Sequence, residues 1–395
     1  MEINKSRKTV DVSTLRQAHD RSERSRGAAG SALTKSKVRS LIQARRMVDS
    51  IDSQVVGLLN KRAKVILDIG KLKARTNGSI YVPEREKEVY RRLAGKNAGP
   101  LSNESLKAIF REIMSGSFEL ERPLVIAYLG PECTFTHLAG IKKFGASVAY
   151  RACRTITDIF SEVEKGMADY GVVPIENSIE GAVNHTLDMF VDSPLRICSE
   201  VYLEVTHNLL SAQPDKDKIK RLYSKAEVFG QCRLWLESNM PRAELIEVSS
   251  TAKAAEIASK EKRVSGCIAS QLAAKRYGLK LLYRSIQDSA YNVTRFLVVG
   301  KYDAKPTSAD KTSIMFSVKD RAGALHDMLV PFKRHKISMT KIESRPSKVR
   351  AWEYYFFVDL EGHSKNSRVE QALAELDAQA SFVKILGSYP VEESV

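Results

Sequence analysis

The stretch NKRAKVILDIGKLKAR, from Asn60 to Arg75, continues an apolar pattern that decides the fold of the first ordered block of this 395-residue chain. Apolar residues recur at alternating spacings of three and four, the heptad pattern of packed helices. They are Leu41, Ala44, Val48, Ile51, Val55, Leu58, Val65, Ile69 and Leu72. The one seam position between Leu58 and Val65 is Arg62. Because an unpaired buried guanidinium is costly, Arg62 needs an anion nearby.

A helix over about 39–73 would be roughly 50 Å long at 1.5 Å per residue. The two helical segments that follow are shorter, so we predict that a second copy covers the seam in an intertwined helical dimer. Lys73 lies about 20° around the helix from Arg62 and about three turns along it. Arg45 is one place off the same seam and could enter from the partner chain. These cations predict a pocket for a small polyanion.

The third helical segment carries Ser117 and Glu121 where its apolar face should continue. They could line the same pocket. The pattern alone allows two simpler interpretations, a solvated helix end for this pair and a salt bridge from Arg62 to an aspartate.

Composition points to a soluble multidomain protein. Hydrophobic residues make up 43% and charged residues 28%, and no apolar run is long enough to span a membrane. The net charge is +16, but no nucleic-acid-binding motif accompanies it, so we expect acidic small molecules as partners. The N-terminus shows no apolar secretion signal, and the five cysteines form no CxxC pair, which predicts reduced thiols in the cytoplasm. The histidines lack metal-ligand spacing, so we expect no metal and no cofactor.

The chain separates into blocks by composition. Residues 1–37 read as a disordered basic tail, 38–122 as a helical domain, 123–301 as an α/β domain, 302–311 as a linker and 312–392 as a βαββαβ domain. The α/β block places polar residues at strand ends and helix starts, which suits a site for a carboxylated ligand, although each stretch could equally be a cap or a turn. The stretches are AYLGPECTFTHLA, VVPIENSIEGAVNHTLD and QDSAYNVTRFLVVG.

The helical block resembles the all-helical chorismate mutases in the spacing of Arg45, Asp52, Arg62, GKLK (Gly70 to Lys73) and PERE (Pro83 to Glu86). The resemblance implies a domain-exchanged dimer in which Arg62 and the partner's copy of residue 45 hold the carboxylates of chorismate. It further implies that Lys73 donates to the ether oxygen, that Glu86 and Ser117 bind the substrate, and that Arg85 orders the site.

Two positions depart from that pattern. Val82 replaces an aspartate found in some members, which leaves hydroxyl recognition to Glu86. Glu121 replaces a glutamine that donates to the ether oxygen, and an ionised carboxylate would repel that oxygen. We therefore predict mutase activity that falls as pH rises.

The α/β block resembles prephenate dehydratases from Leu124 to about Lys301, through segments matching GPxGTF, VPxENS, QCxxWL and TRF. The resemblance implies two lobes like those of periplasmic binding proteins, with Thr294 as the catalytic hydroxyl. Arg295 would hold a carboxylate and Phe296 would pack the ring. Further residues implied in substrate binding are Thr134, Glu176, Asn177, Ser178, Thr186, Ser224, Gln231 and Thr251. Cys133 and the SKAE tetrapeptide at 224–227 depart from the family pattern, so a weakened dehydratase stays an alternative.

The last block resembles an ACT domain of the type attached to these dehydratases. The resemblance implies that GALH (Gly323, Ala324, Leu325 and His326) and ESRP (Glu343, Ser344, Arg345 and Pro346) bind phenylalanine between two ACT domains and inhibit the dehydratase. The residues alone favour a cap and a turn.

The order of the three blocks implies a bifunctional enzyme of phenylalanine biosynthesis, active on chorismate and prephenate, regulated by L-phenylalanine and at least dimeric. Two alternatives are a preference for arogenate in the second step and a non-catalytic amino-acid sensor.

Overall fold

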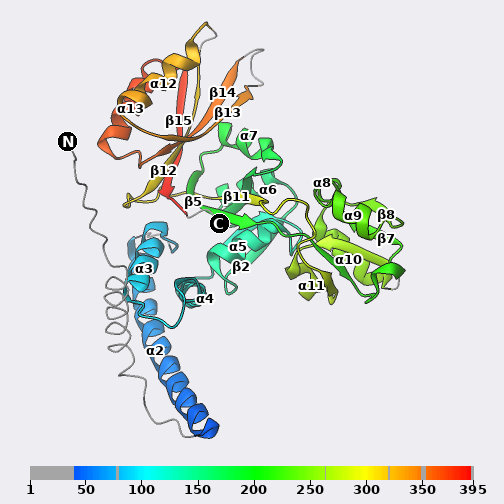
Figure 1. Cartoon of the computed structure of the whole chain (residues 1–395). Coiled ribbons are helices and arrows are strands. Elements are labelled where there is room, and N and C mark those ends of the chain that lie inside the picture. Colours follow the sequence, from blue (N-terminus) through cyan, green and yellow to red (C-terminus); the bar gives the residue numbers. More distant parts are fainter. Residues whose placement is uncertain (1–39, 77–79, 263, 319–320, 348–352, 393–395) are drawn as a thin grey trace, which may run out of the picture. The chain divides into compact units, whose positions relative to one another are not determined.

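The computed structural model describes residues 40–76, 80–262, 264–318, 321–347 and 353–392, and Figure 1 draws its backbone. The predicted tail at 1–37 lies outside the described residues. The chain divides into two compact units, residues 1–62 and 63–395, and each is described by itself.

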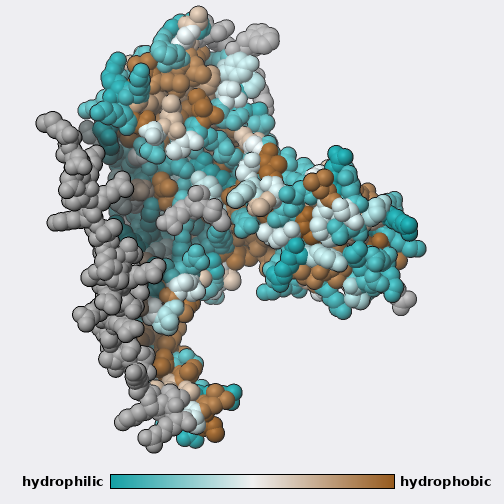
Figure 2. All heavy atoms as spheres, viewed as in Figure 1, coloured by the Kyte–Doolittle hydropathy of each residue, from teal (hydrophilic) through white to brown (hydrophobic). Residues whose placement is uncertain are grey.

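The described part of the first unit is the beginning of helix α2, Leu41–Thr76. Ser40 starts this helix, since its hydroxyl oxygen accepts the Gln43 backbone N–H at 3.2 Å. The apolar seam of α2 faces solvent in the single chain, with Val48 55% and Leu58 63% exposed. Figure 2 shows hydrophobic residues gathered on this part of the helix. The 36-residue length of α2 confirms the long helix predicted from the heptads.

Two shorter helices, α3 (Pro83–Lys96) and α4 (Asn103–Glu121), complete the helical block. Pro83 occupies the first helical position of α3, where its missing N–H costs nothing. Ser102 caps α4 by accepting the Ser105 backbone N–H at 3.1 Å.

The first α/β lobe is a sheet in the order β2-β1-β3-β11-β5, with the short β4 paired to β3. The strands β1, β2 and β3 run parallel, whereas β11 lies antiparallel between β3 and β5. The strands are β1 (Val125–Leu129), β2 (Ala149–Cys153), β3 (Tyr170–Asn177), β4 (Gly181–Ala182), β5 (Arg196–Glu204) and β11 (Val293–Gly300). Its helices are α5 (Phe135–Phe144), α6 (Ile156–Glu164) and α7 (Asn184–Asp192).

The second lobe is a sheet in the order β10-β6-β9-β7-β8, with helices α8 to α11 around it (Figure 1). The strands are β6 (Asn208–Ser211), β7 (Arg221–Ser224), β8 (Glu244–Glu247), β9 (Ser265–Ala269) and β10 (Lys280–Tyr283). The helices are α8 (Ala226–Gln231), α9 (Arg233–Asn239), α10 (Thr251–Glu261) and α11 (Gln271–Tyr277), with a 3-10 turn η1 at Lys216–Lys218. Strand β11 then returns the chain to the first sheet, which gives the predicted two-lobed α/β arrangement.

The last domain has the predicted βαββαβ order and a four-stranded antiparallel sheet, β13-β14-β12-β15. Its elements are β12 (Asp310–Ser317), α12 (Ala324–Arg334), β13 (Met339–Pro346), β14 (Tyr354–Glu361), α13 (Ser367–Asp377) and β15 (Phe382–Pro390). Strand β12 already begins at Asp310, so the last two residues of the predicted linker are strand.

Two of the hydrophobic cores cross the predicted domain boundaries. One contains Leu297 and Ile197 of the first lobe together with Phe357 and Leu386 of the last domain. The other packs Tyr81, from the turn before α3, with residues of the first lobe. The domains of the second unit therefore share apolar interiors.

All five cysteines are free and buried. Within the described ranges, none of the helices has the length and apolar character needed to cross a membrane.

Candidate functional site

The ends of α2 and α4 bring two predicted mutase residues together. Lys73 donates to Glu121, with Nζ 3.0 Å from Oε2, and to the carbonyl oxygen of Ile80 at 3.1 Å. The helices approach closely here, since a Cβ on Gly70 would lie 3.4 Å from Glu121 Cα. Ser117 lies one turn before Glu121 on α4, where it is buried and donates to the Ile113 carbonyl oxygen at 2.7 Å.

Glu86 lies on α3 among partners that sequence reasoning missed. Its Oε2 accepts the hydroxyl of Tyr81 at 2.9 Å and forms an ion pair with Lys143 Nζ at 3.0 Å. Burial by itself would lower the pKa of Lys143, but Glu86 and Glu392 raise it well above its ordinary value. Lys143 comes from α5 of the α/β domain, so only the tertiary fold could reveal this contact.

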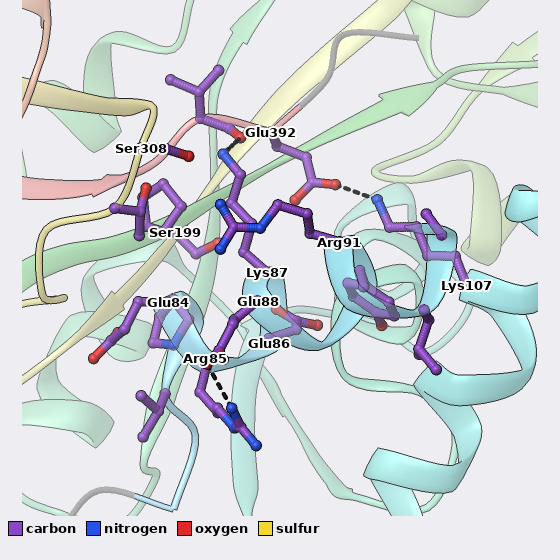
Figure 3. Close-up of a pocket in the computed structure, with 18 of the residues that line it drawn as sticks. Glu84, Arg85, Glu86, Lys87, Glu88, Arg91, Lys107, Ser199, Ser308 and Glu392 are labelled. Carbon is purple, nitrogen blue, oxygen red and sulfur yellow. Dashed lines mark hydrogen bonds and ion pairs between the residues drawn. The ribbon is translucent and has the colours of Figure 1, made fainter. Parts of the chain in front are cut away.

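A pocket of about 830 Å³ lies beside Glu86 and Lys143. It is lined by α3 and the start of α4, by Ser199 and by the segments at 305–308 and 390–392. In Figure 3, Arg85 points toward Glu88, with which it forms an ion pair, and Lys107 reaches Glu392. Arg85 is exposed in this structure.

The two remaining mutase candidates lie on the first part of α2. Arg45 is exposed, whereas Arg62 is half-buried, and burial lowers its pKa. Arg62 is thus more buried than Leu58 and Val65, the seam residues on either side of it.

In the α/β domain, the structure joins three predicted residues in one polar network. Asn177 at the end of β3 donates from Nδ2 to Thr294 Oγ1 and to Asn292 Oδ1, both at 2.8 Å. Asn292 in turn donates to Gln231 Oε1 at 2.9 Å. Gln231 belongs to the second lobe, so the network links the two lobes.

The network contains residues that sequence reasoning did not single out. Gln231 Oε1 lies 2.7 Å from His207 Nε2, and Gln231 Nε2 donates to Glu180 at 2.9 Å. Burial lowers the pKa of the His207 imidazole. His207 stands in a loop without a distinctive motif, whereas Asn292 lies in the QDSAYNVTRFLVVG stretch, two residues before Thr294.

The GPECTF segment forms a tight turn before α5. Thr134 caps the helix, with its Oγ1 donating to the Leu129 carbonyl oxygen at 2.7 Å. Cys133 has a φ of 71°, in the region that favours glycine, and its side chain is buried. Burial raises the pKa of its thiol to about 11. Phe135 contacts the ring of His207 edge-on, which places this turn beside the polar network.

The other predicted hydroxyls serve the backbone in this structure. Ser178 donates to the Tyr291 carbonyl oxygen at 2.9 Å, Thr186 to that of Pro174 at 2.6 Å and Ser224 to that of Ile268 at 2.9 Å. Thr251 is buried at the first turn of α10.

Three residues named by the dehydratase resemblance have protein partners in this structure. Phe296 is 2% exposed within the apolar core of the first lobe, where it cannot pack a substrate ring. Arg295 is buried against Glu200 and Asp359, so its charge is already matched by protein carboxylates. Glu176 forms an ion pair with Lys341 of β13.

The ACT tetrapeptides occupy the start of α12 and the end of β13. Gly323 precedes the helix with a φ of 78°, Ala324 is buried, Leu325 packs against the domain core, and His326 is exposed beside Asp327. Along β13 the exposure alternates, so that Glu343 and Arg345 are half-buried while Ser344 and Pro346 are exposed. Arg345 Nη2 lies 3.1 Å from Asp188 of α7 and forms an ion pair with it.

Among the described residues, no group of three acidic, histidine or cysteine side chains could hold a metal ion.

Comparison with known proteins identifies all three blocks. Residues 44–122 match the family model for chorismate mutase type II, residues 126–304 that for prephenate dehydratase, and residues 312–378 that for the ACT domain.

Relatives that match most of the chain are bifunctional chorismate mutase/prephenate dehydratases. The bifunctional chorismate mutase/prephenate dehydratase of Aquifex aeolicus is 50% identical over 354 residues, covering 89% of this chain and 98% of the relative. That of Neisseria gonorrhoeae is 46% identical over 352 residues, covering 89% and 97%. The crystal structure of prephenate dehydratase from Arthrobacter aurescens in complex with L-Phe matches with 33% identity and a TM-score of 0.64, covering 69% of this chain and 92% of that chain. The chain therefore belongs to the family of bifunctional chorismate mutase/prephenate dehydratases and carries a C-terminal ACT domain.

Proposed function

We propose that this enzyme rearranges chorismate to prephenate in its helical domain and converts prephenate to phenylpyruvate in its α/β domain. We further propose that L-phenylalanine, bound at the ACT domain, inhibits the second step. The observation that carries the proposal is a hydrogen-bond network in a chain of this family. Asn177 binds both Thr294 and Asn292, and Asn292 binds Gln231.

The mutase reaction needs no nucleophile and no proton transfer. It needs a dianion held in its reactive geometry and a donor aimed at the ether oxygen that gains charge. Lys73 supplies that donor, and Glu86 and Ser117 contact the substrate. The exposed seam of α2 supports a homodimer in which the partner covers it and the partner's Arg45 completes the carboxylate site with Arg62.

The dehydratase step expels the ring hydroxyl of prephenate as water and its carboxylate as CO₂, and the ring becomes aromatic. A hydroxyl leaves more easily when a donor hydrogen-bonds to it. Because Thr294 Oγ1 already accepts from Asn177, its own proton is available to the leaving oxygen. Gln231 and Asn292 supply amides to the rest of the substrate, and Thr134 presents a helix start that favours an anion.

One assay tests both activities and the regulation. Purified enzyme is given chorismate, and prephenate and phenylpyruvate are followed with and without saturating phenylalanine. We expect both products, and less phenylpyruvate with phenylalanine present. Absence of phenylpyruvate while prephenate accumulates would mean that Cys133 and the SKAE tetrapeptide have weakened the dehydratase.

Two other readings are separated by the same experiment. An enzyme that prefers arogenate would form phenylalanine from arogenate faster than phenylpyruvate from prephenate. A non-catalytic sensor would form neither product, and it would leave the Lys73–Glu121 arrangement without a role. We also propose a cytoplasmic location, which is supported by the five free, buried cysteines.

A further inference from the structure

Strands β3 and β11 pair with each other, and each carries two neighbouring polar residues. These are Glu176 and Asn177 on β3, and Thr294 and Arg295 on β11. In the register of β3 and β11, Thr294 lies opposite Asn177, and Arg295 lies opposite Glu176. Because successive side chains on a strand point to opposite faces, the two pairs face opposite sides of the sheet. The first pair joins the network that reaches Gln231, and the second pair meets the ACT domain.

Each of the three guanidinium nitrogens of Arg295 binds a protein group of one of the two domains. Its Nε lies 2.8 Å from Glu200 of β5, its Nη1 2.5 Å from Asp359 of β14, and its Nη2 2.9 Å from the Tyr389 hydroxyl of β15. The side chains of Arg295, Glu200 and Asp359 are 7%, 0% and 9% exposed. A second cation, Lys311 of β12, also binds Glu200 at 2.9 Å.

Glu176 meets the same ACT sheet through β13. Its Oε2 lies 2.9 Å from Lys341 Nζ and 4.0 Å from Arg295 Nη1. Lys341 and Arg345 lie on the same face of β13, and Arg345 binds Asp188 of α7. The opposite face of β13 carries Ser344, in the motif proposed to meet phenylalanine.

We propose that Glu176 and Arg295 are positioning residues. The ACT strand β13 binds Glu176 through Lys341, and β14 binds Arg295 through Asp359. By these two contacts the ACT sheet holds the neighbouring Asn177–Thr294 pair in place. The inference rests on the proposed dehydratase function. It departs from the family resemblance, which implies that both residues line the substrate site.

The arrangement also gives phenylalanine a direct route to the dehydratase. A ligand on the outer face of β13 that shifts this strand moves Lys341 and Arg345, which bind Glu176 and Asp188 from its inner face. The two faces of one strand cannot move separately, so effector binding and the position of Asn177 are coupled.

The test is the variant Lys341→Met, which removes one ion pair but leaves the buried Arg295 cluster intact. Lys341→Arg is the conservative variant, which keeps the positive charge. Lys333→Met changes an exposed lysine on α12, and it controls for the loss of a positive charge and the gain of an apolar side chain. The mutase activity of each variant reports whether the chain has folded. Wild-type phenylpyruvate formation is measured first, so that failure of the proposed function is recognised before any variant is made.

For Lys341→Met we expect the dehydratase kcat to fall about tenfold, which equals about 1.4 kcal/mol of barrier, with KM for prephenate changed less than about twofold. Inhibition by saturating phenylalanine should weaken, while calorimetry still detects phenylalanine binding. Lys341→Arg should restore most of kcat, and Lys333→Met should behave as wild type.

Glu176→Gln provides the second, independent measurement. If Glu176 only positions Asn177, this variant lowers kcat, and adding it to Lys341→Met causes little further loss. A rise in KM at unchanged kcat for Glu176→Gln would make Glu176 a substrate ligand and overturn the proposal. Unchanged kcat and unchanged phenylalanine response in Lys341→Met would overturn it as well.

Discussion

Lys73 at the end of α2 and Glu121 at the end of α4 form an ion pair, with Nζ 3.0 Å from Oε2, although 48 residues separate them in the chain. The ammonium group proposed to serve the ether oxygen of chorismate is therefore also a partner of a carboxylate of the same chain. Substrate must share or displace this contact.

The variant Glu121→Gln should change the pH dependence of the mutase. A carboxylate beside the ether oxygen repels the charge that develops there, and a neutral amide can donate to it at every pH. We expect wild-type kcat/KM to fall as pH rises and the variant to stay level, with the two about tenfold apart at the alkaline end. Glu119→Gln, an exposed change on the same helix, is the control. Parallel profiles for Glu121→Gln and wild type would exclude this role.

The exposed seam of α2 predicts a dimer that a single charge can break. Leu58→Asp puts a carboxylate into the seam, where it would be buried without a partner at a cost of several kcal/mol. Sedimentation should show dissociation, with loss of mutase activity but not of dehydratase activity. Asn60→Asp on the outer side of the helix should leave the assembly intact. A wild-type chain that sediments as a monomer and retains mutase activity would contradict the dimer.

Tyr81 should be a stability residue although it lies in the turn before α3. Its ring is 2% exposed and packs against Phe144 and Tyr170 with centroid distances of 4.9 and 5.4 Å. Tyr81→Ala should lower the free energy of unfolding by about 3–5 kcal/mol in denaturant titration, since a large buried ring is removed. Tyr291→Ala, at a side chain that is 85% exposed, should change it by less than about 0.5 kcal/mol.

Glu392 predicts part of the acid sensitivity. Lys143 and Lys107 outweigh the effect of burial and lower the pKa of Glu392 from 4.5 to about 2. Its stabilising contribution, on the order of 3 kcal/mol, is thus complete above pH 4.5 and is lost as pH falls toward 2. Glu392→Gln should unfold more readily than wild type at pH 6, and the difference should shrink between pH 4.5 and 2. Glu361→Gln is the exposed control, and a pH-independent difference would argue against the ion pairs.

Cys133 stands where the family has glycine, at a φ of 71°. A left-handed conformation costs a residue with a side chain about 1–2 kcal/mol, which offsets the benefit of burying the thiol. We expect Cys133→Gly to change the free energy of unfolding by less than about 1 kcal/mol, while Cys133→Ala, which keeps the strain and loses the sulfur, destabilises more. The reverse order would show that packing of the thiol outweighs the backbone strain.

Heptad spacing predicted a helix over about 39–73, and the structure has α2 at Leu41–Thr76. The agreement is close because the apolar period of a helix depends only on residues near one another in the sequence. The βαββαβ order and the strand-end positions of Asn177 and Thr294 also followed from local patterns. No sequence pattern marks Tyr81 as a core residue, yet it belongs to the core of another domain. No local pattern distinguishes a tyrosine that faces solvent from one that meets a remote apolar surface.

The residues after Thr294 show where sequence reasoning ends. The TRF motif located the right strand, but β-strand alternation and a neighbouring sheet decided that Arg295 meets Asp359 and that Phe296 enters the core. By itself the sequence determined the family, the three domains and the elements that carry the polar residues, because period, caps and turns act over a few residues. Only the tertiary structure decided which charge meets which, since ion pairs such as Glu86–Lys143 and Glu176–Lys341 depend on how separate domains pack.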